Sequence, residues 1–83
     1  MINITLKSES NLRLLIGQSG HNISGFAKEV GISHSYLSQI LNGKRNPSPK
    51  VAANIAKNLS SNLEDIFLLS VVAKDNLKLE TFN

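Results

Sequence analysis

The sequence predicts an all-α protein, a single domain of five short helices. Two observations support this fold class. Apolar residues recur at every third or fourth position along most of the chain, which is the spacing of one helix face. An Asn or Ser that can cap a helix precedes most of these stretches, and Gly lies at the end of several of them.

Length and composition limit the kind of protein. Eighty-three residues with 41% hydrophobic content fit one small folded core. Because the chain has no cysteine, disulfides and thiolate metal sites are excluded. The first residues lack the layout of a signal peptide, and no apolar run approaches the ~18 residues of a membrane span. We therefore expect a cytoplasmic protein.

The N-terminal part is predicted to lead into a first helix. Residues 1–8 alternate apolar and polar side chains, and three interpretations remain open: a short strand, an extended arm or a frayed start of the helix. The helix is predicted near Glu9–Ser19, with Gly20 as its stop. Its apolar face consists of Leu12, Leu15 and Ile16.

Two short helices separated by a tight turn are predicted in the centre of the chain. The first spans Ile23–Val30, with Asn22 as its N-cap and Gly31 in the left-handed conformation that ends a helix. Ser33 caps the next helix, predicted over residues 34–42. Its outward face has hydrogen-bonding groups and no charge: His34, Ser35, Ser38 and Gln39.

Two more helices follow. The fourth is predicted over Pro49–Leu59, with Ser48 as N-cap and Pro49 at the first helical position. The fifth starts after Asn62 and carries the apolar residues up to Leu69, and its continuation through Ala73 is left open. We take residues 1–73 as the domain and residues 74–83 as a C-terminal tail.

The apolar run at the end of the domain exceeds what one helix face can bury in so small a protein. This run, residues 66–72, either covers the core of its own subunit or forms a contact between two copies. We expect a symmetric homodimer through Ile66, Leu69 and Val72.

The basic residues are unevenly distributed. No acidic residue lies between Glu29 and Glu64, whereas four of the nine basic residues do: Lys44, Arg45, Lys50 and Lys57. A basic island in a nearly neutral chain is expected where one face meets a polyanion, although a solvated basic face gives the same pattern.

A catalytic role finds no support in the residue types. The chain has two histidines and no cysteine, and the basic island contains no carboxylate. No phosphate-binding glycine loop and no His/Glu metal spacing is present. We predict that the protein is not an enzyme and uses neither a metal nor a cofactor.

A nucleic-acid-binding role accounts for the central features together. Two short helices joined by a glycine turn allow the second to enter the major groove of DNA. There, Gln can bind adenine through two hydrogen bonds. The segment Asn42–Arg45 supplies cations and backbone amides for phosphates, which position a protein without specifying sequence.

The run from Asn22 to Arg45 resembles the phage-repressor and Cro-type (Xre-like) helix-turn-helix family of DNA-binding proteins. The similarity continues through Pro47 and the segment Ile55–Leu59 to Leu63–Phe67, and covers roughly residues 11–67. The residues that carry it in the central run are Ala27, Gly31, Ile32, Ser33, Tyr36, Leu37, Ser38, Ile40 and Asn42–Arg45. The resemblance implies a five-helix, lambda-repressor-like domain.

The resemblance also implies roles for individual residues. The DNA bases would be contacted by His34, Ser35, Ser38 and Gln39. The DNA backbone would be contacted by Asn22, Ser33, Tyr36, Asn42, Lys44, Arg45 and Lys50. The implied partner is double-stranded DNA and the implied function is a transcriptional regulator of the phage or mobile-element repressor type. The alternative is an antitoxin or co-regulator whose main partner is a protein bound by the fifth helix and the tail.

Three departures from the family pattern stand out. Ile23 replaces a glutamine that often follows the cap, so one phosphate contact is lost. Ile16 and Leu41 stand where the family often has an arginine–glutamate ion pair, which an apolar pair can replace without loss of stability. Ser60 stands where glycine often ends the fourth helix.

Overall fold

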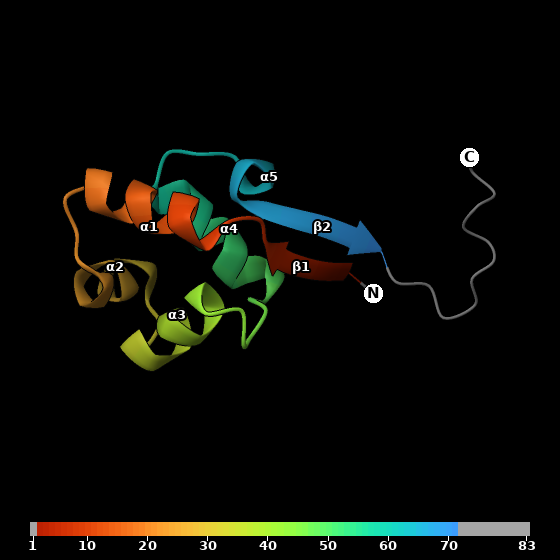
Figure 1. Cartoon of the computed structure of the whole chain (residues 1–83), viewed down its shortest axis with the longest axis horizontal. Helices are drawn as coiled ribbons and strands as arrows, with labels where there is room; N and C mark the ends of the chain where they lie inside the picture. Colours follow the sequence, from red (N-terminus) through yellow and green to blue (C-terminus); the bar gives the residue numbers. More distant parts are fainter. Residues whose placement is uncertain (1, 72–83) are drawn as a thin grey trace.

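The computed structural model describes residues 2–71, which form five helices and one two-stranded sheet (Figure 1). In chain order the elements are β1 (Ile2–Leu6), α1 (Glu9–Gln18), α2 (Ile23–Val30), α3 (His34–Leu41), α4 (Pro49–Asn58), α5 (Leu63–Ile66) and β2 (Phe67–Val71). The bounds predicted for α2 are confirmed, and α1, α3 and α4 each end one residue earlier than predicted. The predicted tail, residues 74–83, lies outside the described residues.

Capping residues start the central helices where the sequence predicts. The side chains of Asn22, Ser33 and Ser48 each accept a hydrogen bond from the backbone amide three residues ahead, at 2.7, 3.0 and 3.2 Å. Each bond satisfies an amide that the helix itself leaves without a partner. These caps fix the first turns of α2, α3 and α4.

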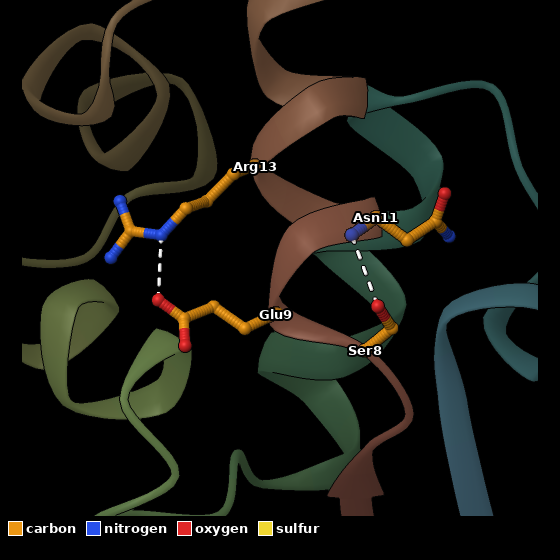
Figure 2. Close-up of polar contacts among 4 residues, drawn as sticks. All are labelled: Ser8, Glu9, Asn11 and Arg13. Carbon is orange, nitrogen blue, oxygen red and sulfur yellow. Dashed lines mark hydrogen bonds and ion pairs between the residues drawn. The ribbon is translucent and has the colours of Figure 1, made fainter.

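The start of α1 has its own cap, Ser8, which was not predicted from the sequence (Figure 2). The Ser8 hydroxyl accepts a hydrogen bond from the Asn11 amide at 3.1 Å. One turn further, Arg13 Nε donates to Glu9 Oε2 at 2.8 Å. Both of these side chains are more than two-fifths exposed, so the ion pair contributes about 0.3–0.5 kcal/mol at most.

The two-stranded sheet corrects the all-α prediction. β1 and β2 pair antiparallel, with Leu6 opposite Phe67 and Ile2 opposite Val71. Of the three interpretations left open for the N-terminal residues, the strand is the one observed. A helix continuing beyond Ile66 is wrong, because Phe67 has an extended backbone (φ −121°, ψ 150°) and the chain pairs with β1 instead.

The core collects apolar side chains from every element. Its largest fully buried members are Leu12, Ile16, Phe26, Leu37, Ile40, Leu41, Ile55, Ile66 and Phe67. Ile16 and Leu41 are 1% and 2% exposed, so the α1–α3 contact is apolar where the family often has an ion pair. Ile66 is 1% exposed within its own subunit, which excludes the intersubunit contact predicted for it.

The paired strands, called the ribbon below, extend away from the helices in Figure 1. Because side chains alternate across a strand, Ile2, Ile4 and Leu6 share one ribbon face with their partners Val71, Leu69 and Phe67. At the base of this face Ile4 and Phe67 are buried in the core. Toward its end, Ile2, Leu69 and Val71 are 52%, 40% and 71% exposed, and these three residues are called the ribbon tip.

Candidate nucleic-acid interface

The turn between α2 and α3 is fixed by backbone geometry. Gly31 has φ +89° and ψ 28°, the left-handed conformation that glycine adopts without strain. The amides of Gly31 and Ile32 both donate to the Ala27 carbonyl at 2.9 Å, which closes the end of α2. Since Ser33 immediately caps α3, the two helices meet across a three-residue turn and pack against one another.

The two faces of α3 differ as the sequence predicts. Its inner face, made by Leu37, Ile40 and Leu41, is buried in the core. Of the predicted base-contacting residues, His34 and Ser35 are exposed, and Ser38 and Gln39 are half-buried. The structure therefore places all four at the surface of one helix, and none of them in the core.

The residues predicted to contact the DNA backbone also lie at the surface, around the ends of α2, α3 and α4. Exposed members are Asn22, Ser33, Asn42, Lys44, Arg45 and Lys50, and Tyr36 is half-buried. Asn22 and Ser33 are N-caps, and Asn42 is the C-cap of α3. Lys50 lies in the first turn of α4, next to the N-terminal end of that helix, which attracts anions.

The segment after α3 is a compact turn. Gly43 has φ +74°, and the Lys44 amide donates to the Gln39 carbonyl at 2.9 Å. Within residues 2–71 the one ion pair joins Glu9 and Arg13, so no carboxylate there neutralises the cations of this turn. The turn consequently presents positive charge beside the polar face of α3.

Arg45 makes contacts that sequence reasoning missed. Its guanidinium carbon lies 5.1 Å from the centroid of the Tyr36 ring, and its Nη1 lies 3.5 Å from Gln39 Oε1. The contact joins residues six and nine positions apart across the end of a helix. No periodic signal in the sequence reports such a contact, because it depends on how the turn folds back.

Other kinds of site find little support in the described part of the chain. Residues 2–71 contain no group of three or more His, Cys, Asp or Glu side chains that could hold a metal ion. A pocket between the ends of α1 and α4 is lined by Leu15, Gln18, Ser19, Asn58, Leu59 and Ser60, none of which is ionisable. None of the described helices has the length and apolar character needed to span a membrane.

A capped pair of short helices joined by a glycine turn, with a polar outer face on the second, defines a helix-turn-helix domain. The family model described as helix-turn-helix matches residues 12–66, most of the chain. The protein therefore belongs to the Xre/Cro-like helix-turn-helix family of DNA-binding proteins.

A solved structure shares this fold. The crystal structure of the clp gene regulator ClgR from Corynebacterium glutamicum aligns with a TM-score of 0.61 and 23% sequence identity. The alignment covers 69% of the present chain, which spans 61% of the length of that chain. The comparison with curated proteins found no match.

Proposed function

We propose that this protein is a sequence-specific transcriptional regulator that inserts α3 into the major groove of DNA, as small phage and mobile-element repressors do. The observation that carries the proposal is the outer face of α3, which is polar and uncharged and lies beside a cationic turn. Uncharged hydrogen-bonding groups suit base edges, whereas cations suit phosphates.

Four side chains of α3 are the proposed base contacts: His34, Ser35, Ser38 and Gln39. Gln39 is the most informative, because a glutamine amide can donate to N7 and accept from N6 of adenine at once. Its half-buried position restricts its motion, which favours a defined contact over a mobile one.

The proposed backbone contacts surround this face. Lys44, Arg45 and Lys50 would supply charge, and Asn22, Ser33, Tyr36 and Asn42 would supply hydrogen-bonding groups. Asn22 Oδ1 and Ser33 Oγ already accept bonds as caps, so their remaining contribution to a phosphate is the Asn22 amide nitrogen and the Ser33 hydroxyl hydrogen.

Selection of bound sequences from a random duplex pool tests the proposal. We expect one enriched motif, and we expect Gln39→Ala to relax the preference at one base pair, at a cost of about 1–3 kcal/mol on the best site. Lys44→Ala is the matched comparison, because it should weaken all sequences alike and flatten the salt dependence. Absence of any enriched motif would contradict sequence-specific binding.

A second copy of the chain is the proposed partner of the ribbon tip. Its three exposed apolar residues continue the face that is buried at the ribbon base. One α3 covers only a short stretch of groove, and helix-turn-helix proteins commonly reach longer sites as twofold dimers. Leu69 belongs to the predicted dimer contact and lies in the ribbon tip, and Val72 lies outside the described residues.

The same surface supports the alternative function, an antitoxin or co-regulator bound by another protein. In that case the ribbon tip would hold a heterologous partner and the chain alone would remain monomeric. Sedimentation of the purified protein separates the two proposals, because a concentration-dependent dimer supports the first.

A further inference from the structure

Arg45 lies between two side chains of α3. Its guanidinium covers the Tyr36 ring at 5.1 Å, and its Nη1 faces Gln39 Oε1 at 3.5 Å, a long hydrogen bond. Tyr36 and Gln39 are three residues apart on α3 and therefore neighbours on one side of the helix. One planar cation thus reaches an aromatic ring and the amide of a proposed base-contacting residue.

The Tyr36 ring gives Arg45 a fixed support. Tyr36 is half-buried and packs against the core, so its ring does not move freely. A guanidinium stacks on an aromatic face because it is planar and delocalised, which an ammonium group is not. The contact with the ring therefore restrains the Arg45 side chain, and Nη1 lies beside Gln39 Oε1.

The contact distinguishes the two ends of the Gln39 amide. A glutamine amide carries an acceptor on one side and two donors on the other, and rotation by half a turn exchanges them. Since a guanidinium can only donate, Arg45 favours the rotamer that turns Oε1 toward it and Nε2 away from it.

We propose that Arg45 is a positioning residue for base recognition, which fixes the orientation of the Gln39 amide before DNA binds. This inference rests on the proposed function. A carbonyl oxygen has two lone pairs, so Oε1 accepts from Arg45 and from adenine N6 together while Nε2 donates to N7. The fixed amide then selects the orientation of an A·T pair in which N6 lies on the Arg45 side.

A role in phosphate binding alone makes a different prediction. The guanidinium has five donors, of which the Gln39 contact uses one, so Arg45 can also contact a phosphate. Any cation could replace it in that role, because a phosphate contact depends mainly on charge. The arginine and lysine variants of this position therefore separate positioning from charge.

The experiment compares Arg45→Lys with Lys57→Arg, an exchange of one cation for another at an exposed position of α4. Binding is measured on the selected site and on the variants of the base pair identified by Gln39→Ala. For Arg45→Lys we expect an unchanged salt slope and a roughly three- to tenfold loss of discrimination at that base pair. For Lys57→Arg we expect both quantities to stay at their wild-type values, because Lys57 is exposed on α4 and is not among the proposed DNA contacts.

Two substitutions of Tyr36 test whether its ring holds Arg45 in place. Tyr36→Phe keeps the ring, so discrimination should stay at the wild-type level even if a hydroxyl–phosphate contact is lost. Tyr36→Leu removes the ring and should reproduce the loss seen with Arg45→Lys. In a Gln39→Ala background, Arg45→Lys should cause no further loss of discrimination, because the residue that it positions is absent.

A measurement on the free protein is independent of DNA. The side-chain amide resonances of Gln39 should shift in Arg45→Lys and remain in place in Lys57→Arg. Full discrimination by Arg45→Lys, or unshifted Gln39 resonances in it, would overturn the inference while leaving the proposed function intact. If the wild type enriches no sequence, the proposed function fails. The Gln39 amide resonances of Arg45→Lys then still show whether the contact between Arg45 and Gln39 exists.

Discussion

Ile4 and Leu69 are direct partners across the ribbon, yet Ile4 is 3% exposed and Leu69 is 40% exposed. The two side chains share one ribbon face, so the edge of the core passes between them. At this pair, Ile4 contributes to the core and Leu69 presents an apolar surface to solvent.

Substitution of Ile4 should lower the free energy of unfolding much more than substitution of its partner Leu69. Ile4→Ala is expected to lower the free energy of unfolding by about 2–5 kcal/mol, because it leaves a cavity in the core. Leu69→Ala should cost less than about 1 kcal/mol, since much of that side chain already meets solvent. Urea denaturation followed by circular dichroism measures both values. Equal losses in the two variants would contradict this placement of the core edge.

Charge at the ribbon tip should prevent the proposed dimer. Val71→Lys places an ammonium group at a position that is 71% exposed, so the fold should persist while apolar association between copies is lost. Sedimentation equilibrium should then give the mass of a monomer. Leu14→Lys is the matched control, because Leu14 is 58% exposed on α1, and it should leave the dimer unchanged. A wild type that is itself monomeric would exclude the dimer.

Asn22 can be tested for capping and for DNA binding separately. Asn22→Asp keeps an oxygen that can accept the Gly25 amide, and its negative charge is favourable at a helix N-terminus. We expect unchanged or slightly higher stability with about tenfold weaker DNA binding at low salt, because the carboxylate repels phosphates. Asn22→Ala should instead lower stability by about 1 kcal/mol. If Asn22→Asp binds DNA as well as the wild type, Asn22 is not near a phosphate.

The left-handed turn between α2 and α3 should tolerate glycine best. A Cβ at Gly31 would meet no atom within 4 Å, so Gly31→Ala tests the backbone conformation alone. At φ +89° we expect a loss of about 1–2 kcal/mol in thermal or chemical unfolding. Gly17 is equally open but lies within α1, so Gly17→Ala should raise stability by about 0.5–1 kcal/mol. Stabilisation by both variants would show that the turn is not constrained.

Ser60 offers the converse test. It has φ +54° and is the one non-glycine residue with positive φ in the described part of the chain. Ser60→Gly should relieve the left-handed strain and raise stability by about 0.5–1 kcal/mol, net of the entropy that glycine loses on folding. Ser61→Gly in the same loop is the control and should lower stability, because Ser61 has no such strain.

The helices were predictable because their signals are local. Asn22, Ser33 and Ser48 each cap the helix that follows within one residue, and Gly31 ends α2 by its own conformational freedom. The outward face of α3 followed from the same spacing, since the buried positions of a helix determine the exposed ones. The roles of its side chains came from the resemblance to the family and stay predictions.

The second strand of the ribbon was not predictable from local signals. The run that follows Ile66 is apolar at nearly every position, and a short run of this kind fits a buried helix as well as a strand. Phe67 belongs to a strand because it pairs with Leu6. Leu6 lies at the other end of the described chain, so the residues next to Phe67 give no sign of this pairing. The Arg45 contacts escaped prediction for a related reason, since they depend on a turn whose path is set by Gly43 and not by side-chain periodicity.

Pairing between Leu6 and Phe67 also orders the events of folding. Helical contacts close short loops and form early, whereas this pairing must close a loop of nearly the whole described chain. We therefore expect the helix pair α2–α3 to assemble before the ribbon exists. A newly made chain would then acquire its helix-turn-helix first, and a surface for a second copy only when the last strand is in place.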